Sequence, residues 1–216
     1  MELIVGSKDK KTPYVLSGKI SETRIDEREL LTGAPVSVDL EYWVADSTSN
    51  WNNTANWDTT SGGPGGASVP GTDTTVVFDP AGLGSCIIDI SPQVAHMILD
   101  GYTGVFFGEC TTTRLDLVSD YASAGSDTTI HALGDVSGSA LYGAWTSGNN
   151  LPIEFNGPGT QKLTISSGCV LPVVITNKRV SQQVICHGDS PILVNGGFLI
   201  HDGTFNMNGR DIQVGI

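Results

Sequence analysis

The most constraining feature of this chain is a series of short apolar segments, separated by Gly, Asn and Asp, that runs from residue 86 to residue 214. Val, Ile and Phe favour strands, whereas Gly, Asn and Asp favour turns. We predict strands, none longer than about eight residues, at residues 86–90, 95–99, 114–118, 129–133, 152–155, 161–165, 180–186, 197–200, 203–207 and 211–214. Strands at such regular spacing are typical of a β-sandwich, a β-barrel or a β-solenoid.

The connections between these segments leave more than one all-β architecture open. Two-residue Asp-Gly and Asn-Gly turns favour hairpins, and such pairs occur at residues 100–101, 156–157, 195–196, 202–203 and 208–209. Hairpins would give an antiparallel β-sandwich or jelly roll. Residues 196–214, however, repeat a strand of four or five residues and a glycine-containing corner with almost no residues to spare. This rhythm also describes the sides and corners of a coil, so a β-solenoid fits as well.

The N-terminal segment, residues 1–41, differs in composition from the rest, because Lys, Arg, Asp and Glu are much denser there than in residues 42–216. We therefore divide the chain into a charged N-terminal attachment segment, residues 1–41, and a β domain, residues 42–216. Within the charged segment, Thr23 followed three residues later by Asp26 predicts the start of one short helix.

An alternating pattern at residues 34–44 predicts a half-buried strand. Apolar side chains such as Leu40 and Tyr42 fall on one face, and Asp39 and Glu41 fall on the other. We interpret the apolar face as buried and the two carboxylates as solvated rather than as an acid pair.

Three tryptophans, Trp43, Trp51 and Trp57, lie close together in the sequence. Large indoles beside a strand that opens an apolar core suit a cap over the end of a stack, and we place such an entrance or cap at residues 42–85. Aromatic faces also stack on sugar rings, so Trp51, Trp57 and Trp145 are the candidates for a glycan platform.

Charge and hydropathy exclude two classes of partner. The chain has 11 Lys and Arg against 23 Asp and Glu, and its net charge of −12 repels a phosphate backbone, so no nucleic acid is expected. No stretch resembles a signal peptide or the run of about 18 apolar residues that a membrane span requires. We therefore expect synthesis in the cytoplasm and no membrane partner.

The cysteines and histidines show no metal-binding spacing, so we predict neither a metal site nor a cofactor. No two cysteines form a CxxC pair, and we expect buried free thiols at Cys86, Cys110, Cys169 and Cys186. No two histidines have helical i, i+4 spacing. We interpret any approach of residues 186–187 to residues 201–202 across neighbouring coils as chance adjacency.

Several short motifs follow one another in a characteristic order: Asn56-Trp57, Pro70-Gly-Thr-Asp73, Val76-Val-Phe-Asp79, Cys86-Ile-Ile-Asp89, Leu99-Asp-Gly-Tyr-Thr-Gly104, Phe155-Asn-Gly-Pro-Gly-Thr-Gln161 and Gly203-Thr-Phe-Asn-Met-Asn-Gly209. Their order resembles the right-handed parallel β-helix surface and fibre proteins of bacteria and of the tailed phages that infect them. The resemblance covers residues 43–216 and implies a right-handed β-solenoid with coils of about 20 residues. Residues 86–214 would then form about five or six coils.

The resemblance also implies a function. Bacterial members usually carry a secretion signal and a membrane anchor, and neither is visible here, so the chain resembles a phage virion component made in the host cytoplasm. The expectation is a non-enzymatic structural protein of the virion, in a head decoration, a fibre or a tail fibre. Its expected partners are copies of itself, with a trimer among the arrangements left open, and other virion proteins. Residues 1–41 would dock by strand addition or, as the alternative, complete the first sheet of the stack, and a partner would cover residues 211–216.

Two alternatives are less favoured. The first is an adhesin that binds a host surface glycan through Trp51, Trp57 or Trp145. The second is a polysaccharide depolymerase, which needs two carboxylates across a sugar or a basic residue near an acidic cluster. Its candidate carboxylates are Asp116, Asp120, Asp127 and Asp135, and its candidate bases are Arg114, Lys162, Lys178, Arg179 and Arg210. These residues share no motif.

Overall fold

The computed structural model describes residues 3–5, 14–16, 39–119, 123–125, 127–139, 151–167, 169–171, 173–179, 181–188, 191–194 and 196–214. The chain divides into two compact units, Met1–Ser37 and Val38–Ile216. In the first unit, β1 (Leu3–Val5) and β2 (Tyr14–Leu16) pair in antiparallel orientation. The helix predicted to start near Thr23 lies outside the described residues.

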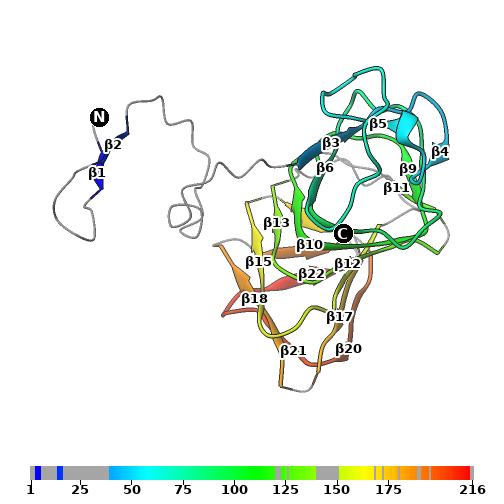
Figure 1. The fold of residues 1–216 in the computed structure, drawn as a ribbon. Helices are drawn as coiled ribbons and strands as arrows, with labels where there is room; N and C mark the ends of the chain where they lie inside the picture. Colours follow the sequence, from blue (N-terminus) through cyan, green and yellow to red (C-terminus); the bar gives the residue numbers. More distant parts are fainter. Residues whose placement is uncertain are drawn as a thin grey trace. The chain divides into compact units, whose positions relative to one another are not determined.

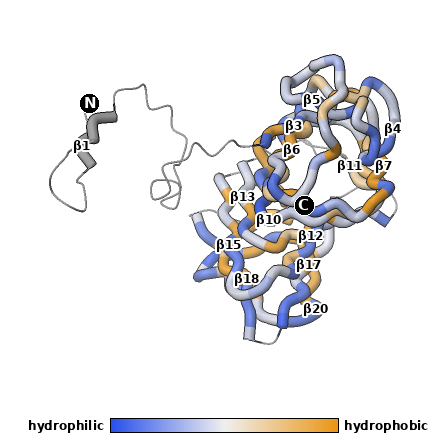
Figure 2. The backbone as a smooth tube through the Cα atoms, in the orientation of Figure 1, coloured by the Kyte–Doolittle hydropathy of each residue, from blue (hydrophilic) through white to orange (hydrophobic). Residues whose placement is uncertain are grey.

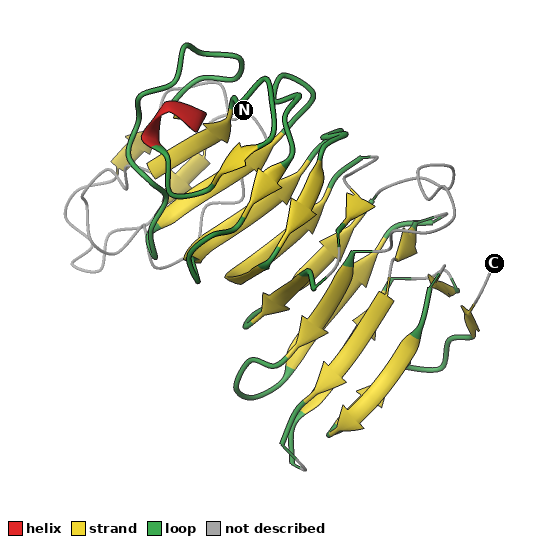
Figure 3. Cartoon of the chain, turned by 90° about the vertical axis from the view of Figure 1, so that its right-hand side faces the viewer, coloured by secondary structure: helices red, strands yellow, loops and turns green. Residues whose placement is uncertain are grey.

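The second unit is a stack of short strands arranged on three sides (Figures 1 and 3). The first side contains β12 (Thr129–Ala132), β14 (Pro152–Phe155), β17 (Val173–Asn177) and β20 (Phe198–Asp202). The second side contains β3 (Asp39–Trp43), β6 (Thr74–Phe78), β13 (Val136–Gly138), β15 (Gln161–Ile165), β18 (Gln183–His187) and β21 (Thr204–Asn206). The first and second sides are joined by β8 (Gln93–Leu99) and β10 (Glu109–Leu117), which run through both.

The third side consists of two smaller sheets. One contains β4 (Ser49–Asn50), β7 (Cys86–Ile87), β9 (Val105–Phe107) and β11 (Ser123–Ala124). The other contains β16 (Val170–Leu171), β19 (Ile192–Val194) and β22 (Ile212–Val214). A short 3-10 helix, η1 (Thr54–Asn56), leads into β5 (Trp57–Asp58), which pairs with β3. Because β3 begins at Asp39, the stack starts before the boundary predicted at residue 42.

Neighbouring strands on each side are parallel and come from successive passes of the chain. On the second side Leu99 pairs with Leu117, Leu117 with Gly138 and Gly138 with Ile165, so each of these passes is longer than the one before it. The passes form a β-solenoid of about six turns. The predicted parallel β-solenoid is therefore confirmed. The β-sandwich alternative is wrong, because the antiparallel pairs among the described strands are only β1–β2 and β3–β5.

The Asp-Gly and Asn-Gly pairs at residues 100–101, 156–157, 202–203 and 208–209 lie at corners of the coils and not in hairpins, whereas Asn195 of the fifth pair lies outside the described residues. Gly101, Gly203 and Gly209 have positive φ angles of 78°, 83° and 77°, which glycine adopts without steric penalty. The strands on either side of Gly203, β20 and β21, pair with other strands and not with each other. The same turn residues thus redirect the chain from one side of the coil to the next.

The interior of the stack is filled by columns of apolar side chains, one residue from each coil. The main column of the second side consists of consecutive register partners, each at most 1% exposed: Val76, Met97, Leu115, Val136, Leu163 and Cys186. Full burial of one such side chain stabilises a fold by about 1.5–3 kcal/mol. Every additional coil therefore contributes both strand hydrogen bonds and core contacts.

An aromatic cluster fills the first coils. Trp43, Trp51 and Trp57 are all 0% exposed. The Trp57 ring centroid lies 5.2 Å from that of Trp43, 4.7 Å from that of Trp51 and 5.7 Å from that of Phe78. Trp57 Nε1 also donates a hydrogen bond to the Trp51 carbonyl oxygen over 2.8 Å. The cluster closes the interior where the stack begins, and β5 pairs with the edge of β3 there.

The inward face of β3 is opposite to the one predicted. Glu41 is 1% exposed and Trp43 is fully buried, whereas Leu40 and Tyr42 are only half-buried. The prediction that Glu41 faces solvent is wrong, because the large Trp43 indole takes the core position and a period of two then places Glu41 on the same face. Glu41 Oε1 accepts a hydrogen bond from Ser68 Oγ, and Oε2 is buried with no hydrogen-bond partner. Burial raises the pKa of Glu41 in spite of the Ser68 bond.

Candidate functional site

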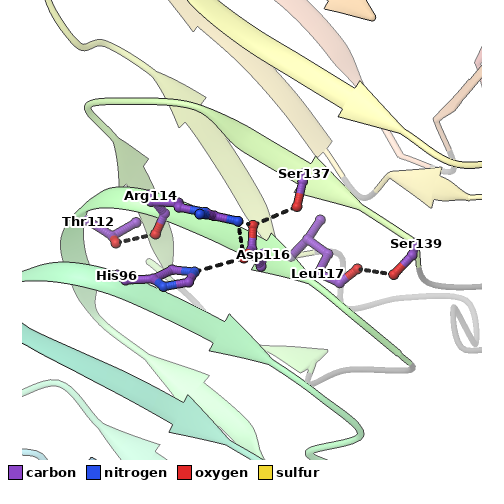
Figure 4. A network of polar contacts seen from close by, with 7 residues as sticks. All are labelled: His96, Thr112, Arg114, Asp116, Leu117, Ser137 and Ser139. Carbon is purple, nitrogen blue, oxygen red and sulfur yellow. Dashed lines mark hydrogen bonds and ion pairs between the residues drawn. The ribbon is translucent and has the colours of Figure 1, made fainter. Parts of the chain in front are cut away.

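The most connected polar cluster on the second side joins three successive coils and consists of His96, Arg114, Asp116 and Ser137 (Figure 4). His96 Nε2 lies 2.9 Å from Asp116 Oδ2, and Arg114 Nη2 lies 2.8 Å from the same oxygen. Ser137 Oγ donates to Asp116 Oδ1 over 2.5 Å. We call these four residues the Asp116 network.

The Asp116 network holds its carboxylate ionised. Burial alone would raise the pKa of Asp116, but hydrogen bonds from His96, Ser137 and Arg114 outweigh it and hold the pKa far below its ordinary value. The serine and the histidine both bond to the carboxylate and not to each other. The serine is therefore not activated by the histidine, as a nucleophile would require. The network links neighbouring coils electrostatically.

A second polar cluster lies on the first side, again with one residue from each coil. His131 Nδ1 lies 2.6 Å from Glu154 Oε2, and His131 Nε2 lies 3.5 Å from Glu109 Oε2. Asn177 Nδ2 donates to Glu154 Oε1 over 2.7 Å. Glu109, His131, Glu154 and Asn177 therefore form a ladder across β10, β12, β14 and β17, which we call the His131 ladder.

The described candidate carboxylates of the depolymerase alternative do not converge. Asp116 lies on the second side within its network, and Asp135 lies in the corner before β13, where its Oδ1 accepts a hydrogen bond from the Lys162 backbone N–H over 2.8 Å. Asp127 lies between β11 and β12, at a different corner, with a φ of 59°. Asp120 lies outside the described residues. Asp116 and Asp135 each serve their own local contacts.

The predicted basic residues are equally scattered. Arg114 belongs to the Asp116 network. Lys162 lies in β15 on the second side, and Arg179 lies at the corner between β17 and β18. Lys178 is 2% exposed, and its Nζ donates to the carbonyl oxygens of Gly157 and Gly159 over 2.5 and 3.1 Å. Burial lowers the pKa of Lys178. This lysine fastens one corner of the stack to the next.

Arg210 and the remaining histidine pairs do not form a site either. Both terminal nitrogens of Arg210 are buried without a hydrogen-bond partner. Cys186 and His187 belong to β18, whereas His201 and Asp202 belong to β20, and these strands lie on different sides. Among the described residues, no group of three or more His, Cys, Asp or Glu is placed to hold a metal ion.

The four cysteines are buried, as predicted, and Cys86, Cys110 and Cys186 are free thiols. Burial raises the pKa of Cys110 to about 12 and that of Cys186 to about 11, so both remain thiols at neutral pH. They fill the core as small apolar side chains.

The tryptophans proposed for sugar stacking are not exposed. Trp51 and Trp57 present no ring face to solvent, because both are 0% exposed and pack against each other. Trp145 lies outside the described residues. The cap does contain a polar cleft of about 300 Å3, which is lined by Ala45, Asp46, Ser49, Asn56, Gly63 and Pro64 among others. This cleft offers no aromatic surface.

The last coil exposes residues that are buried in the coils before it. On the first side Thr176 is 0% exposed and its register partner Ile200 is 51% exposed. On the third side Val194 is 0% exposed and its partner Val214 is 48% exposed. Each of β20, β21 and β22 pairs with one strand only, so three strand edges are open at this end of the described structure. An open edge accepts a further strand, from this chain or from a partner.

The polar clusters could be detected in the sequence only through the coil period. The contacts of Asp116 with His96 and Ser137 span 20 and 21 residues, and the contact of Glu154 with Asn177 spans 23. Polar residues that recur about one coil apart are the signal. Reading it requires the lengths of the individual coils, which vary.

Comparison with known proteins identifies no relative: no protein-family model, no curated protein and no solved structure matches the chain. Among the described residues, no helix has the length and apolar character needed to span a membrane.

Proposed function

We propose that the protein is a non-enzymatic structural component of a bacteriophage virion that assembles with copies of itself and docks on a capsid or tail surface. The observation that carries the structural role is that the polar side chains of two sides bind one another across coils. The Asp116 network and the His131 ladder each join at least three successive strands. Such bonds make a stack rigid, and a rigid stack suits a decoration or a fibre.

The phage assignment rests on the motif order between Trp57 and Gly209, which resembles phage and bacterial β-helix proteins. In this proposal the protein is made in the host cytoplasm and resides in the virion. Residues 1–41 form the attachment segment, because their charge density differs from that of the stack. Strand addition to another virion protein is the mode that we propose for this segment.

The adhesin alternative has lost part of its basis. Sugar stacking needs an exposed ring face, and Trp51 and Trp57 are buried. A host glycan as partner stays a prediction that now depends on Trp145 or on polar residues alone.

The proposed function is tested by locating the protein in particles. We expect an antibody against the chain to label purified virions in immunogold electron microscopy at a regular position on the head or tail. Particles from a strain in which the gene is deleted are the control. Absence of the chain from purified particles would refute the virion assignment. Release of reducing ends from capsule or lipopolysaccharide by the purified protein would instead favour the depolymerase.

A further inference from the structure

Asn-Gly pairs are chemically reactive positions of a protein chain, because glycine has no side chain to shield its backbone nitrogen. That nitrogen can attack the side-chain carbonyl carbon of the asparagine before it. The attack requires a free glycine N–H, an unbound asparagine amide and room for the backbone between them to rotate. Three such pairs occur here, at residues 156–157, 195–196 and 208–209. Asn195 lies outside the described residues, whereas both residues of the first and third pairs are described.

The fold blocks all three requirements at Asn156 and Gly157. The Gly157 N–H donates a hydrogen bond to Gln161 Oε1 over 3.0 Å. The side-chain amide of Asn156 is also engaged, because its Nδ2 lies 3.1 Å from His131 Nδ1. Gly157 is buried, and a Cβ on it would overlap the Leu133 carbonyl oxygen, so the backbone has no room to rotate. This pair is held in an unreactive arrangement.

The fold leaves Asn208 and Gly209 open to reaction. Both residues are exposed and form the turn between β21 and β22, with φ angles of 52° and 77°. A Cβ on Gly209 would meet no atom within 4 Å. The Asn208 backbone N–H donates to Asn206 Oδ1 over 2.9 Å, so the turn is held by a neighbouring side chain. Among the described residues, none bonds to the Asn208 side-chain amide or to the Gly209 N–H.

The position in the stack adds to this difference. Asn208 and Gly209 belong to the last described coil, in which β21 pairs only with β18 and β22 only with β19. The strands that flank Gly157, β14 and β15, each have neighbours on both sides. A terminal coil opens most easily, because it contacts one neighbour. At the end of β20, where this coil turns toward β21, the hydrophilic colours in Figure 2 mark exposed residues in contact with water, which is a reactant.

We propose that Asn208 is a site of spontaneous deamidation, whereas the fold protects Asn156. The Gly209 nitrogen forms a bond to Cγ of Asn208, and the bond from Cγ to the side-chain nitrogen breaks. Ammonia leaves with the proton of the Gly209 N–H. A water molecule from the solvent then opens the five-membered succinimide at either of its carbonyl groups. Aspartate or isoaspartate results at position 208, and no enzyme, metal or oxidant takes part.

The reaction would change the open end of the stack. Either product adds a negative charge to the exposed turn, and isoaspartate also adds one carbon to the backbone between β21 and β22. Because β22 is aligned with β19 by consecutive register partners, beginning with Ile212 opposite Ile192, a longer corner should loosen this strand. The strand edges that are open to a further strand would be altered with it. This inference goes beyond the proposed function and does not depend on it.

Peptide mapping of the folded full chain by mass spectrometry tests the proposal. The protein is kept at about pH 8 and about 37 °C in water enriched in oxygen-18, which labels the carboxylate formed when the succinimide opens. We expect Asn208 to convert at least about tenfold faster than Asn156, because only the terminal coil opens readily. A synthetic peptide of residues 205–211 gives the rate of the unprotected sequence. Equal rates at the two sites, or an Asn208 that stays unconverted while the peptide reacts, would overturn the proposal.

Unfolding separates the effect of the fold from that of the flanking residues. In concentrated urea the bonds of Asn156 and Gly157 to His131 and Gln161 are lost, so both asparagines should convert at rates within about threefold of each other. A gap that persists in urea would show that local sequence sets the difference, and it would refute protection by the fold.

A conservative variant identifies the reacting residue. Asn208→Gln keeps an exposed amide but would have to close a larger, six-membered ring, so labelling of the peptide that contains position 208 should cease. Labelling that continues in this variant would assign the reaction to another residue and overturn the proposal. In the aged parent protein, hydrogen exchange of the β22 amides should be faster than in fresh protein, and unchanged exchange would refute the loosening of this strand. None of these outcomes depends on whether the protein occurs in virions.

Discussion

Removal of the ionisable group at residue 41 should flatten the pH dependence of stability. Glu41 is 1% exposed, and its Oε2 has no hydrogen-bond partner. Burial raises its folded-state pKa above the value of 4.5 expected for an unfolded chain, so the folded state binds this proton more tightly. The stability linked to Glu41 is fully present below about pH 4.5 and is lost as the pH rises through the folded-state pKa.

The Glu41→Gln variant keeps an acceptor for Ser68 and cannot ionise. Its stability should equal that of the parent in acid and exceed it at higher pH, by about 1.4 kcal/mol for each unit between the folded and unfolded pKa values. The double variant Glu41→Met/Ser68→Ala also removes the unpartnered oxygen. It should gain a further increment of about 1–3 kcal/mol, the penalty of one unsatisfied buried group.

Urea unfolding followed by circular dichroism between about pH 4 and pH 9 measures both effects. Asp73→Asn is the control, because it removes an exposed carboxylate from the same cap and should follow the parent curve. If the parent and Glu41→Gln keep a constant difference in free energy of unfolding at every pH, Glu41 does not ionise in a buried site and the reasoning fails.

Three further predictions concern stability. Trp57→Ala should lower the free energy of unfolding by about 3–5 kcal/mol, because it empties the centre of the aromatic cluster and removes the bond to the Trp51 carbonyl; a loss below about 1 kcal/mol in urea unfolding would contradict a core role. Gly157→Ala should lower the melting temperature strongly, because the new Cβ would overlap the Leu133 carbonyl oxygen. Gly71→Ala is the control, because a Cβ there meets open space, and this variant should melt like the parent. Equal melting temperatures of the two variants would show that the backbone does not approach Gly157 so closely. Asp116→Asn should lower the free energy of unfolding by about 1.5–3 kcal/mol at neutral pH and by less in acid. The reason is that the lowered folded-state pKa of Asp116 supplies stability that is present above the ordinary value of 3.8 and is lost as the pH falls through the folded-state pKa. If the parent and the variant lose stability equally as the pH falls, the network does not hold the carboxylate ionised.

The sequence predicted some strands well and missed others, among them the five-residue β17 and the first half of β10. The strands predicted at residues 152–155 and 161–165 agree with β14 and β15. By contrast, β13 and β19 have three residues each, too few for any periodicity to show.

The sequence alone could not predict which face of β3 points inward or which polar residues form clusters. A pattern of alternating residues fixes two faces and does not say which of them is inward. The choice depended on Trp43 and on the partner residues of β6. The same holds for Asp116 and Ser137, which meet because one coil brings residues 21 positions apart into contact. The coils differ in length, and this shifts such partners in ways that spacing rules do not anticipate.

The unequal ends of the stack give the molecule a preferred direction of mechanical failure. A pulling force applied at both ends would meet interlocked indole rings at one end and half-exposed Phe198 and Ile200 at the other. Peeling should therefore begin at β22 and proceed one coil at a time, in a sawtooth of similar force peaks, until the rings near Trp57 give way last. A protein anchored at the end that contains the indole rings would unfold its outer coils under force and stay attached at that end.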